Sequence, residues 1–309
     1  MQAFYTDRFV LPLPAGHRFP MEKYRLLREQ VAAQLPGVSL TEPPPAADVD
    51  LARAHDPEYI DRLAGGQLTK IEQQKIGFPW SEAMVERSRR SAGATLAACR
   101  AALAAQSIAV NLAGGTHHAY PDRGEGFCCF NDAAVAARTM QAEGLAHRVL
   151  ILDLDVHQGN GTAVVFQHDP TVFTVSLHGE DNYPFQKEVS DIDRGLPNGT
   201  GDADYLACLD EVLEETSRQF SPDLLIYLAG ADPLASDRLG RLALSHEGLR
   251  DRDQRVLAFA EALGLPVAVA MAGGYARPIE DTVAAHFNTV RLCYEFSRVR
   301  DAPVVAEYG

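Results

Sequence analysis

The chain has 309 residues, 46% of them hydrophobic, and a formal net charge of −14. Phosphate binding needs clustered lysine and arginine, so this acid excess argues against a nucleic acid partner; most of it is expected to form a solvated surface. No apolar run is long enough to cross a membrane, and the N-terminal residues lack the features of a signal peptide. Five cysteines without a C-x-x-C pair argue against a disulfide framework, so we expect a reduced, cytoplasmic setting.

Apolar, β-rich runs alternate with amphipathic stretches along the chain. The predicted strands are Ala3–Tyr5, Ile108–Leu112, Val149–Leu154, Val172–Leu177, Leu224–Leu228 and Val267–Met271. The predicted helices are Ser81–Ala105, Asp132–Glu143, Asp202–Phe220, Ser245–Leu263 and Pro278–Phe296. Continuous apolar strands between helices are typical of a parallel sheet that is covered on both faces. We therefore predict a single three-layer α/β/α domain over residues 1–309, with a central, mainly parallel sheet.

One long segment, Gly179–Gly201, is polar and rich in proline and glycine. Long loops in compact domains are usually functional, so we expect a loop at the rim of a site there.

The strand predicted at Val149–Leu154 leads into Asp153, Asp155 and His157, at alternate positions. Alternate residues of a strand face the same way. Buried carboxylates are costly unless a cation or hydrogen bonds satisfy them. The pattern therefore predicts a metal or acid–base site at the carboxyl end of this strand. The alternative is that these acids only cap the next turn.

Other strand ends carry matching groups, and ligands bind beyond the carboxyl ends of parallel strands. In chain order these groups are His117 and His118, Ser176 and His178, Asp232, and Gly273, Gly274 and Tyr275. Two carboxylates and one imidazole suit a catalytic divalent cation, most often zinc. We predict Asp155, His157 and Asp232 as its ligands. From the residues alone, His117 and His118 could be further ligands, acid–base groups or packed loop histidines.

The motifs GGTHHA, GFCCFND, LDLDVHQGNG, GADPLASDRLG and GGY occur in this order. Together they resemble the zinc-dependent histone deacetylase family of the arginase–deacetylase superfamily. The stretches GHRFPMEKYRLL and SLHGEDNYPF are most similar to the class IV branch and its bacterial relatives. The resemblance implies an enzyme that removes acetyl, and possibly longer fatty acyl, groups from the side-chain amine of acyl-lysine in proteins or peptides.

The resemblance also implies roles for individual residues. Zn²⁺, with Fe²⁺ as an alternative, would be held by the three predicted ligands. His118 would be the general base, His117 would pair with Asp153, and Tyr275 would donate a hydrogen bond to the oxyanion. The remaining implied positions are a potassium site at Asp153, Asp155, His157, Ser176 and Leu177, a second one at Phe166, Asp169 and Val172, a substrate tunnel at Gly126, Phe127, Leu239, Gly273 and Gly274, and an internal product channel at Arg18.

Two positions depart from the best-known branch of that family. Asn160 stands where that branch pairs its general base with an aspartate, so we expect His118 to have a lower pKa. Thr116 stands where the branch has a bulky aromatic residue, so we expect room for acyl groups longer than acetyl.

Three rival functions remain open. An acetylpolyamine hydrolase would use the same site, although the chain shows no obvious insertion that narrows the tunnel. An arginase-like hydrolase would have a different order of ligands from Asp155-x-His157. A non-catalytic binding module would have lost Tyr275 or a metal ligand, and all of these residues are present. The sequence does not indicate the physiological substrate or the oligomeric state.

Overall fold

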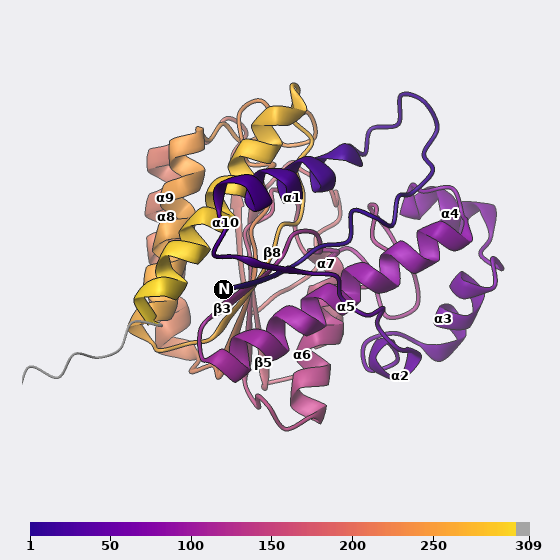
Figure 1. Ribbon diagram of the computed structural model, residues 1–309, viewed down its shortest axis with the longest axis horizontal. Helices are drawn as coiled ribbons and strands as arrows, with labels where there is room; N and C mark the ends of the chain where they lie inside the picture. Colours follow the sequence, from indigo (N-terminus) through magenta and orange to yellow (C-terminus); the bar gives the residue numbers. More distant parts are fainter. Residues whose placement is uncertain (301–309) are drawn as a thin grey trace, which may run out of the picture.

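A computed structural model of the protein describes residues 1–300, which form a central sheet between two layers of helices (Figure 1). Eight strands, all parallel, follow the order β2-β1-β3-β8-β7-β4-β5-β6. Their bounds are β1 Gln2–Phe4, β2 Ser39–Thr41, β3 Ile108–Asn111, β4 Val149–Asp153, β5 Val172–Gly179, β6 Ile192–Leu196, β7 Leu224–Leu228 and β8 Val267–Ala270. Every residue of β4, β7 and β8 is buried, as their continuous apolar sequence requires. The predicted fold class is confirmed.

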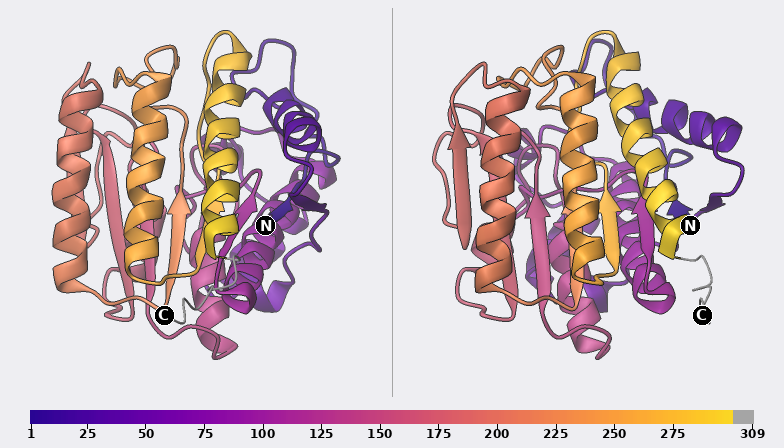
Figure 2. Two further views of the ribbon diagram at one scale, coloured as in Figure 1. Left: turned by 60° about the vertical axis from the view of Figure 1, so that its left-hand side comes forward. Right: turned by 90° about the vertical axis from the view of Figure 1, so that its left-hand side faces the viewer.

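Helices cover both faces of the sheet. They are α1 Glu22–Gln34, α2 Asp48–Leu51, α3 Pro57–Ala64, α4 Lys70–Ile76, α5 Glu82–Ala105, α6 Asp132–Ala142, α7 Asn160–Phe166, α8 Asp202–Gln219, α9 His246–Ala262 and α10 Ile279–Arg300. Ile151 of β4 faces the core that contains α5 and α6, whereas its neighbours Leu150 and Leu152 face the core that contains α1, α8, α9 and α10. Figure 2 shows α8, α9 and α10 side by side over one face.

The six predicted strands and the five predicted helices are present, but two edge strands were missed. In β2, no residue is fully buried, so it carries no apolar signal. The prediction of a loop throughout Gly179–Gly201 is wrong, because β6 lies inside it and pairs with β5. Only Ile192 and Leu196 of β6 are buried, and backbone pairing rather than side-chain pattern defines this strand.

Residues 301–309 of the predicted domain lie outside the described part of the chain. Within the described part, no helix has the length and apolar character needed to span a bilayer.

Candidate active site

The carboxyl end of β4 provides the first group of acids. The strand itself ends at Asp153, so Asp155 and His157 lie in the turn beyond it, and the predicted strand alternation does not extend to these two residues. The turn is held by its own acids: Asp153 Oδ1 accepts a hydrogen bond from the Asp155 amide at 3.1 Å, and Asp155 Oδ1 accepts one from the His157 amide at 2.9 Å. These bonds turn the backbone so that the three polar side chains stay buried at the edge of the sheet.

Asp155, His157 and Asp232 converge at this edge, as predicted. Their potential ligand atoms all lie within 4.8 Å of one another. His157 Nδ1 is 2.9 Å from Asp155 Oδ1 and 3.2 Å from Asp232 Oδ2. Asp232 reaches the site because β7 is the neighbour of β4 in the sheet. All three residues are at least nine-tenths buried.

The electrostatics of this triad suit a bound cation. Burial and the nearby charge of Asp155 raise the pKa of Asp232 to about 7. Asp232 Oδ1 accepts a hydrogen bond from the Val156 amide, whereas its buried Oδ2 accepts none among the described residues, because the nearby His157 Nδ1 is bonded to Asp155 Oδ1. A divalent metal would stabilise both carboxylates and use this oxygen as a ligand. The donor set therefore fits a divalent metal.

A glycine is required beside the triad. The Gly273 amide donates to Asp155 Oδ2 at 2.7 Å, and a Cβ at this position would collide with Asp232 Oδ2. The predicted involvement of Gly273 is thus explained by a close approach of backbone to the acids.

His117 and His118 follow β3 through Gly114 and Gly115, which have φ values of 79° and 73°. His117 Nδ1 donates to Asp153 Oδ2 at 2.6 Å. Burial opposes the protonation of His117, but the charges of Asp153 and Asp155 outweigh it and raise the pKa of His117 to about 9. The structure thus brings together the His117–Asp153 pair that the family resemblance implied.

His118 lies beside His117, with a ring-centroid distance of 4.1 Å, and contacts Asn160 at the start of α7. Its Nδ1 is 2.6 Å from Asn160 Oδ1, and since an amide oxygen can only accept, Nδ1 carries the proton and Nε2 is a free base. The pKa of His118 is well below its usual value, in the direction expected. The main cause is different, however: burial comes first, followed by the charges of His117 and His157.

The contacts of Asn160 extend beyond His118. Its Nδ2 donates to the Tyr120 hydroxyl at 3.0 Å, and that hydroxyl donates to Glu188 Oε1 at 3.1 Å. Sequence reasoning missed Tyr120 and Glu188, because nothing in the chain marks either of them as part of a network with the distant Asn160.

Tyr275 is buried beside the triad, and its ring centroid is 6.5 Å from that of His157. Its amide donates to Asp237 Oδ2 at 2.5 Å. The Lys23 ammonium lies 5.2 Å from its ring centroid and donates to the carbonyls of Ala272 and Gly274, both at 3.3 Å. Sequence reasoning missed Asp237 and Lys23, although both lie inside motifs that were singled out.

Comparisons with known proteins agree with this arrangement. The profile of the histone deacetylase domain matches residues 17–290. The chain belongs to the histone deacetylase family. It is 47% identical over 286 residues to an uncharacterized protein of Picosynechococcus sp., covering 91% of this chain and 94% of that one. It is 32% identical over 311 residues to a histone deacetylase-like amidohydrolase of Pseudomonas aeruginosa, covering 94% and 80%.

The fold comparison gives the same family. The crystal structure of an HDAC homolog from Aquifex aeolicus superposes with a TM-score of 0.81 at 26% identity and covers 96% of this chain and 83% of that one. As a member of this family, the chain is a deacetylase or amidohydrolase with a buried Asp-His-Asp metal site. The assignment to the class IV branch stays a prediction.

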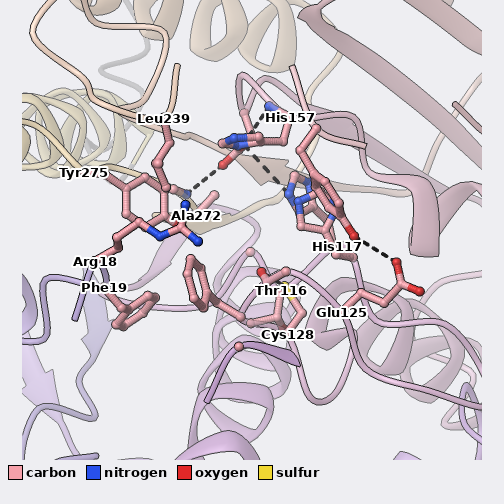
Figure 3. Close-up of a pocket in the computed structure, with 18 of the residues that line it drawn as sticks. Arg18, Phe19, Thr116, His117, Glu125, Cys128, His157, Leu239, Ala272 and Tyr275 are labelled. Atoms are coloured by element: carbon pink, nitrogen blue, oxygen red, sulfur yellow. Dashed lines mark hydrogen bonds and ion pairs between the residues drawn. The ribbon is translucent and has the colours of Figure 1, made fainter. Parts of the chain in front are cut away.

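A cavity of about 810 Å³ leads to the site (Figure 3). Phe127 and Gly126, which were expected to form a tunnel, line it, and both have positive φ. Leu239 lines it too, with its amide bonded to Asp237. Gly274 does not: it packs against Thr282 and His286 behind the cavity. The segment after β5 adds Tyr183, whose ring meets that of His118 edge-on at 4.9 Å and whose hydroxyl donates to Glu125.

Arg18 is placed differently from what the family resemblance implied. It lines the cavity, but its side chain is exposed rather than internal, since it lies in the irregular segment before α1. The buried cations on this side of the cavity are Lys23 and Arg87.

The expected potassium positions fall in two places. Asp153 and Ser176 are register partners on β4 and β5, with Leu177 next along β5. Phe166 ends α7 and Val172 begins β5, whereas the Asp169 carboxylate between them already binds Arg138 and Thr171.

Proposed function

We propose that the protein is a zinc-dependent lysine deacylase, with iron(II) as the alternative metal, acting as one catalytic domain. The observation that carries this proposal is the convergence of three elements on one cavity: the Asp155-His157-Asp232 triad, the free Nε2 of His118, and Tyr275. The apolar side chains of Phe127 and Leu239 line the cavity and suit the stem of a lysine side chain.

The residues have complementary tasks in amide hydrolysis. The metal, when bound, would polarise the acyl carbonyl and lower the pKa of a water molecule. His118 Nε2 accepts the proton of the attacking water and later returns it to the lysine amine that leaves. The Tyr275 hydroxyl donates a hydrogen bond to the carbonyl oxygen as negative charge develops there, an interaction worth about 3 kcal/mol when it is preorganised.

The histidine pair differs in charge, which separates the two roles. Asp153 favours protonated His117, and this charge in turn helps to keep His118 neutral, so His118 is the better base. We further propose that K⁺ binds near Asp153 and Ser176, with Asp155, His157 and Leu177 contributing, where it would offset the buried acid charge.

We propose that the small side chain of Thr116 leaves room for acyl groups longer than acetyl. Its side chain is held by Asp132 and by the Phe130 carbonyl, and it lines the cavity. A threonine fixed in this way leaves space that a bulky aromatic side chain would fill. Acetylpolyamines are a less suitable substrate class, because basic side chains outnumber carboxylates in the cavity lining and would repel a polycation. The basic residues are Arg18, Lys75, Arg87, Arg238 and Arg241, and the acidic ones are Glu125, Asp155 and Asp181.

Deacylation of acetyl-, octanoyl- and myristoyl-lysine peptides by the metal-loaded protein tests the proposal. We expect hydrolysis that is lost after chelation and falls at least about a hundredfold in Tyr275→Phe, since a preorganised oxyanion donor contributes about that much. Tyr294→Phe, a change on α10 outside the cavity, is the control. Full activity in Tyr275→Phe would contradict the role of its hydroxyl, and a strict preference for acetyl would contradict the role of Thr116.

A further inference from the structure

Arg87 is a buried cation at the inner end of the cavity. It lies on α5, is only 6% exposed, and lines the cavity together with Ser91, one turn further along the helix. Within residues 1–300, its guanidinium has no hydrogen-bond acceptor and no carboxylate within 4 Å. Two other arginines of the same helix differ: Arg89 pairs with Asp48, and Arg90 pairs with Glu86.

The surroundings of Arg87 provide aromatic faces but no negative charge. Its guanidinium carbon is 4.9 Å from the ring centroid of Tyr24 and 5.5 Å from that of Phe19. The second buried cation, Lys23, is 5.2 Å from the same Tyr24 ring and binds only backbone carbonyls. The buried carboxylate of Asp132 is already occupied by the Thr95 hydroxyl and by the amides of Gly115 and Thr116.

A buried cation without an anion is costly, because its lost hydration is not replaced. The guanidinium of Arg87 opens onto a cavity, so a ligand can supply the missing charge there. A carboxylate fits best, because its two oxygens match the parallel N–H groups of a guanidinium.

This inner end lies where the acyl group of a substrate would extend. Its wall includes Gly114, Gly115 and Thr116, which directly precede His117 and His118. Gly115 packs against Ala272. The next residue, Gly273, donates its amide to Asp155. Figure 3 shows Phe19, Thr116, Ala272 and Tyr275 around this part of the cavity. The opposite end is the mouth, where Phe185 is 81% exposed.

We propose that Arg87 forms a carboxylate subsite and that the enzyme hydrolyses acyl-lysines whose acyl chain ends in a carboxylate, such as succinyl- and glutaryl-lysine. The inference rests on the proposed function and narrows it: among chains of equal size, the charged one is preferred. In the reaction, the amide C–N bond breaks, the oxygen of water is added to the acyl carbon, and both protons of that water pass to the lysine nitrogen. The products are lysine, as its ammonium form, and a dicarboxylate.

The test compares two peptides that differ only at the end of the acyl chain. Succinyl-lysine and 4-methylpentanoyl-lysine have nearly the same shape, but only the first carries a charge. We expect a higher kcat/KM for the succinyl peptide, and the ratio between the two should fall by about tenfold or more in Arg87→Met. Arg87→Lys should keep part of the ratio, and Arg90→Met, on the same helix but outside the cavity, should leave it unchanged. Both peptides are measured on each variant, so a general loss of activity cancels.

Three outcomes are distinct. If the enzyme hydrolyses none of the acyl-lysine peptides, acetyl-lysine included, the proposed function itself fails. Hydrolysis of acetyl-lysine together with rejection of succinyl-lysine, or an unchanged ratio in Arg87→Met, would overturn only the carboxylate subsite. If either of these results overturns the carboxylate subsite, a higher inhibition constant for free acetate in Arg87→Met would show that Arg87 holds the released acid and not a charged acyl chain.

Discussion

Arg252, on α9, supports the metal site from behind, and its replacement tests how that site is held. The residue is 1% exposed. Its Nη1 donates to the carbonyl of Gly230 at 2.6 Å and to that of Leu154 at 3.3 Å. Leu154 directly precedes Asp155, and Gly230 lies two residues before Asp232, so one guanidinium holds the backbone next to two metal ligands.

The partner of Arg252 is equally buried. Asp253 Oδ1 accepts from its Nε at 2.9 Å and from the Tyr227 hydroxyl at 2.5 Å, and Oδ2 accepts from the Thr289 hydroxyl at 2.5 Å. Arg252→Met would keep the volume but leave this carboxylate without its cation. Breaking a buried pair by removing one partner costs about 3–5 kcal/mol, a large part of the total stability of a domain.

Denaturant unfolding of wild type and variants measures this cost. We expect Arg252→Met to lower the free energy of unfolding by about 3–5 kcal/mol. The double variant Arg252→Met/Asp253→Asn should lose less than the sum of the single changes, because no buried charge is then left unpaired. Arg255→Met is the matched control: it removes an exposed pair with Asp210 and should cost less than about 1 kcal/mol. A loss below about 1 kcal/mol in Arg252→Met, or strict additivity in the double variant, would refute the reasoning.

Two further predictions concern pH. Asn160→Asp places a carboxylate beside His118 Nδ1, so it should raise the pKa of His118 and move the acidic limb of the kcat/KM profile to higher pH; an unmoved limb would contradict the pairing. Burial lowers the pKa of His55 to about 4. Below about pH 6.5 the unfolded chain therefore binds a proton at this histidine that the folded protein does not bind, and the stability falls as the pH drops from there toward 4. His55→Gln should therefore reduce the stability lost between about pH 7.5 and about pH 5 by about 2 kcal/mol, as measured by denaturant unfolding at both values.

Much of the metal site follows from strand patterns alone. Because parallel strands end at the same edge, the acids after β4 and β7 could be expected to meet, and they do. The order of the strands could not be predicted, yet it explains the whole arrangement. In the series β3-β8-β7-β4, the strand ends lead in turn to His118, Tyr275, Asp232 and Asp155, and Ser176 lies within the next strand, β5.

The buried cations show where sequence patterns fail. Lys23 and Arg87 are charged, so their residue type alone assigns them to the surface, although helical spacing places Lys23 on the same face as the buried Leu27 and Val31. They are buried because folding brings Lys23 to the Gly274 carbonyl and Arg87 to the Tyr24 ring, and the sequence of each helix does not indicate these distant partners. The segment after β5 is a similar case, because Tyr183 reaches His118 only through the folded path of a polar chain.

Asp237 connects the wall of the cavity to Tyr275. Its Oδ1 accepts the amides of Leu239 and Gly240 at 2.8 and 2.9 Å, and its Oδ2 accepts the amide of Tyr275. A single carboxylate therefore fixes two segments that are thirty-six residues apart in the chain, from Leu239 to Tyr275. In sequence it would be taken for an ordinary turn aspartate, since such residues commonly bind nearby amides. The long-range bond has a functional consequence: the wall that would contact the acyl-lysine stem and the hydroxyl that would meet its carbonyl are held in register with each other, so a change at Asp237 should disturb both together.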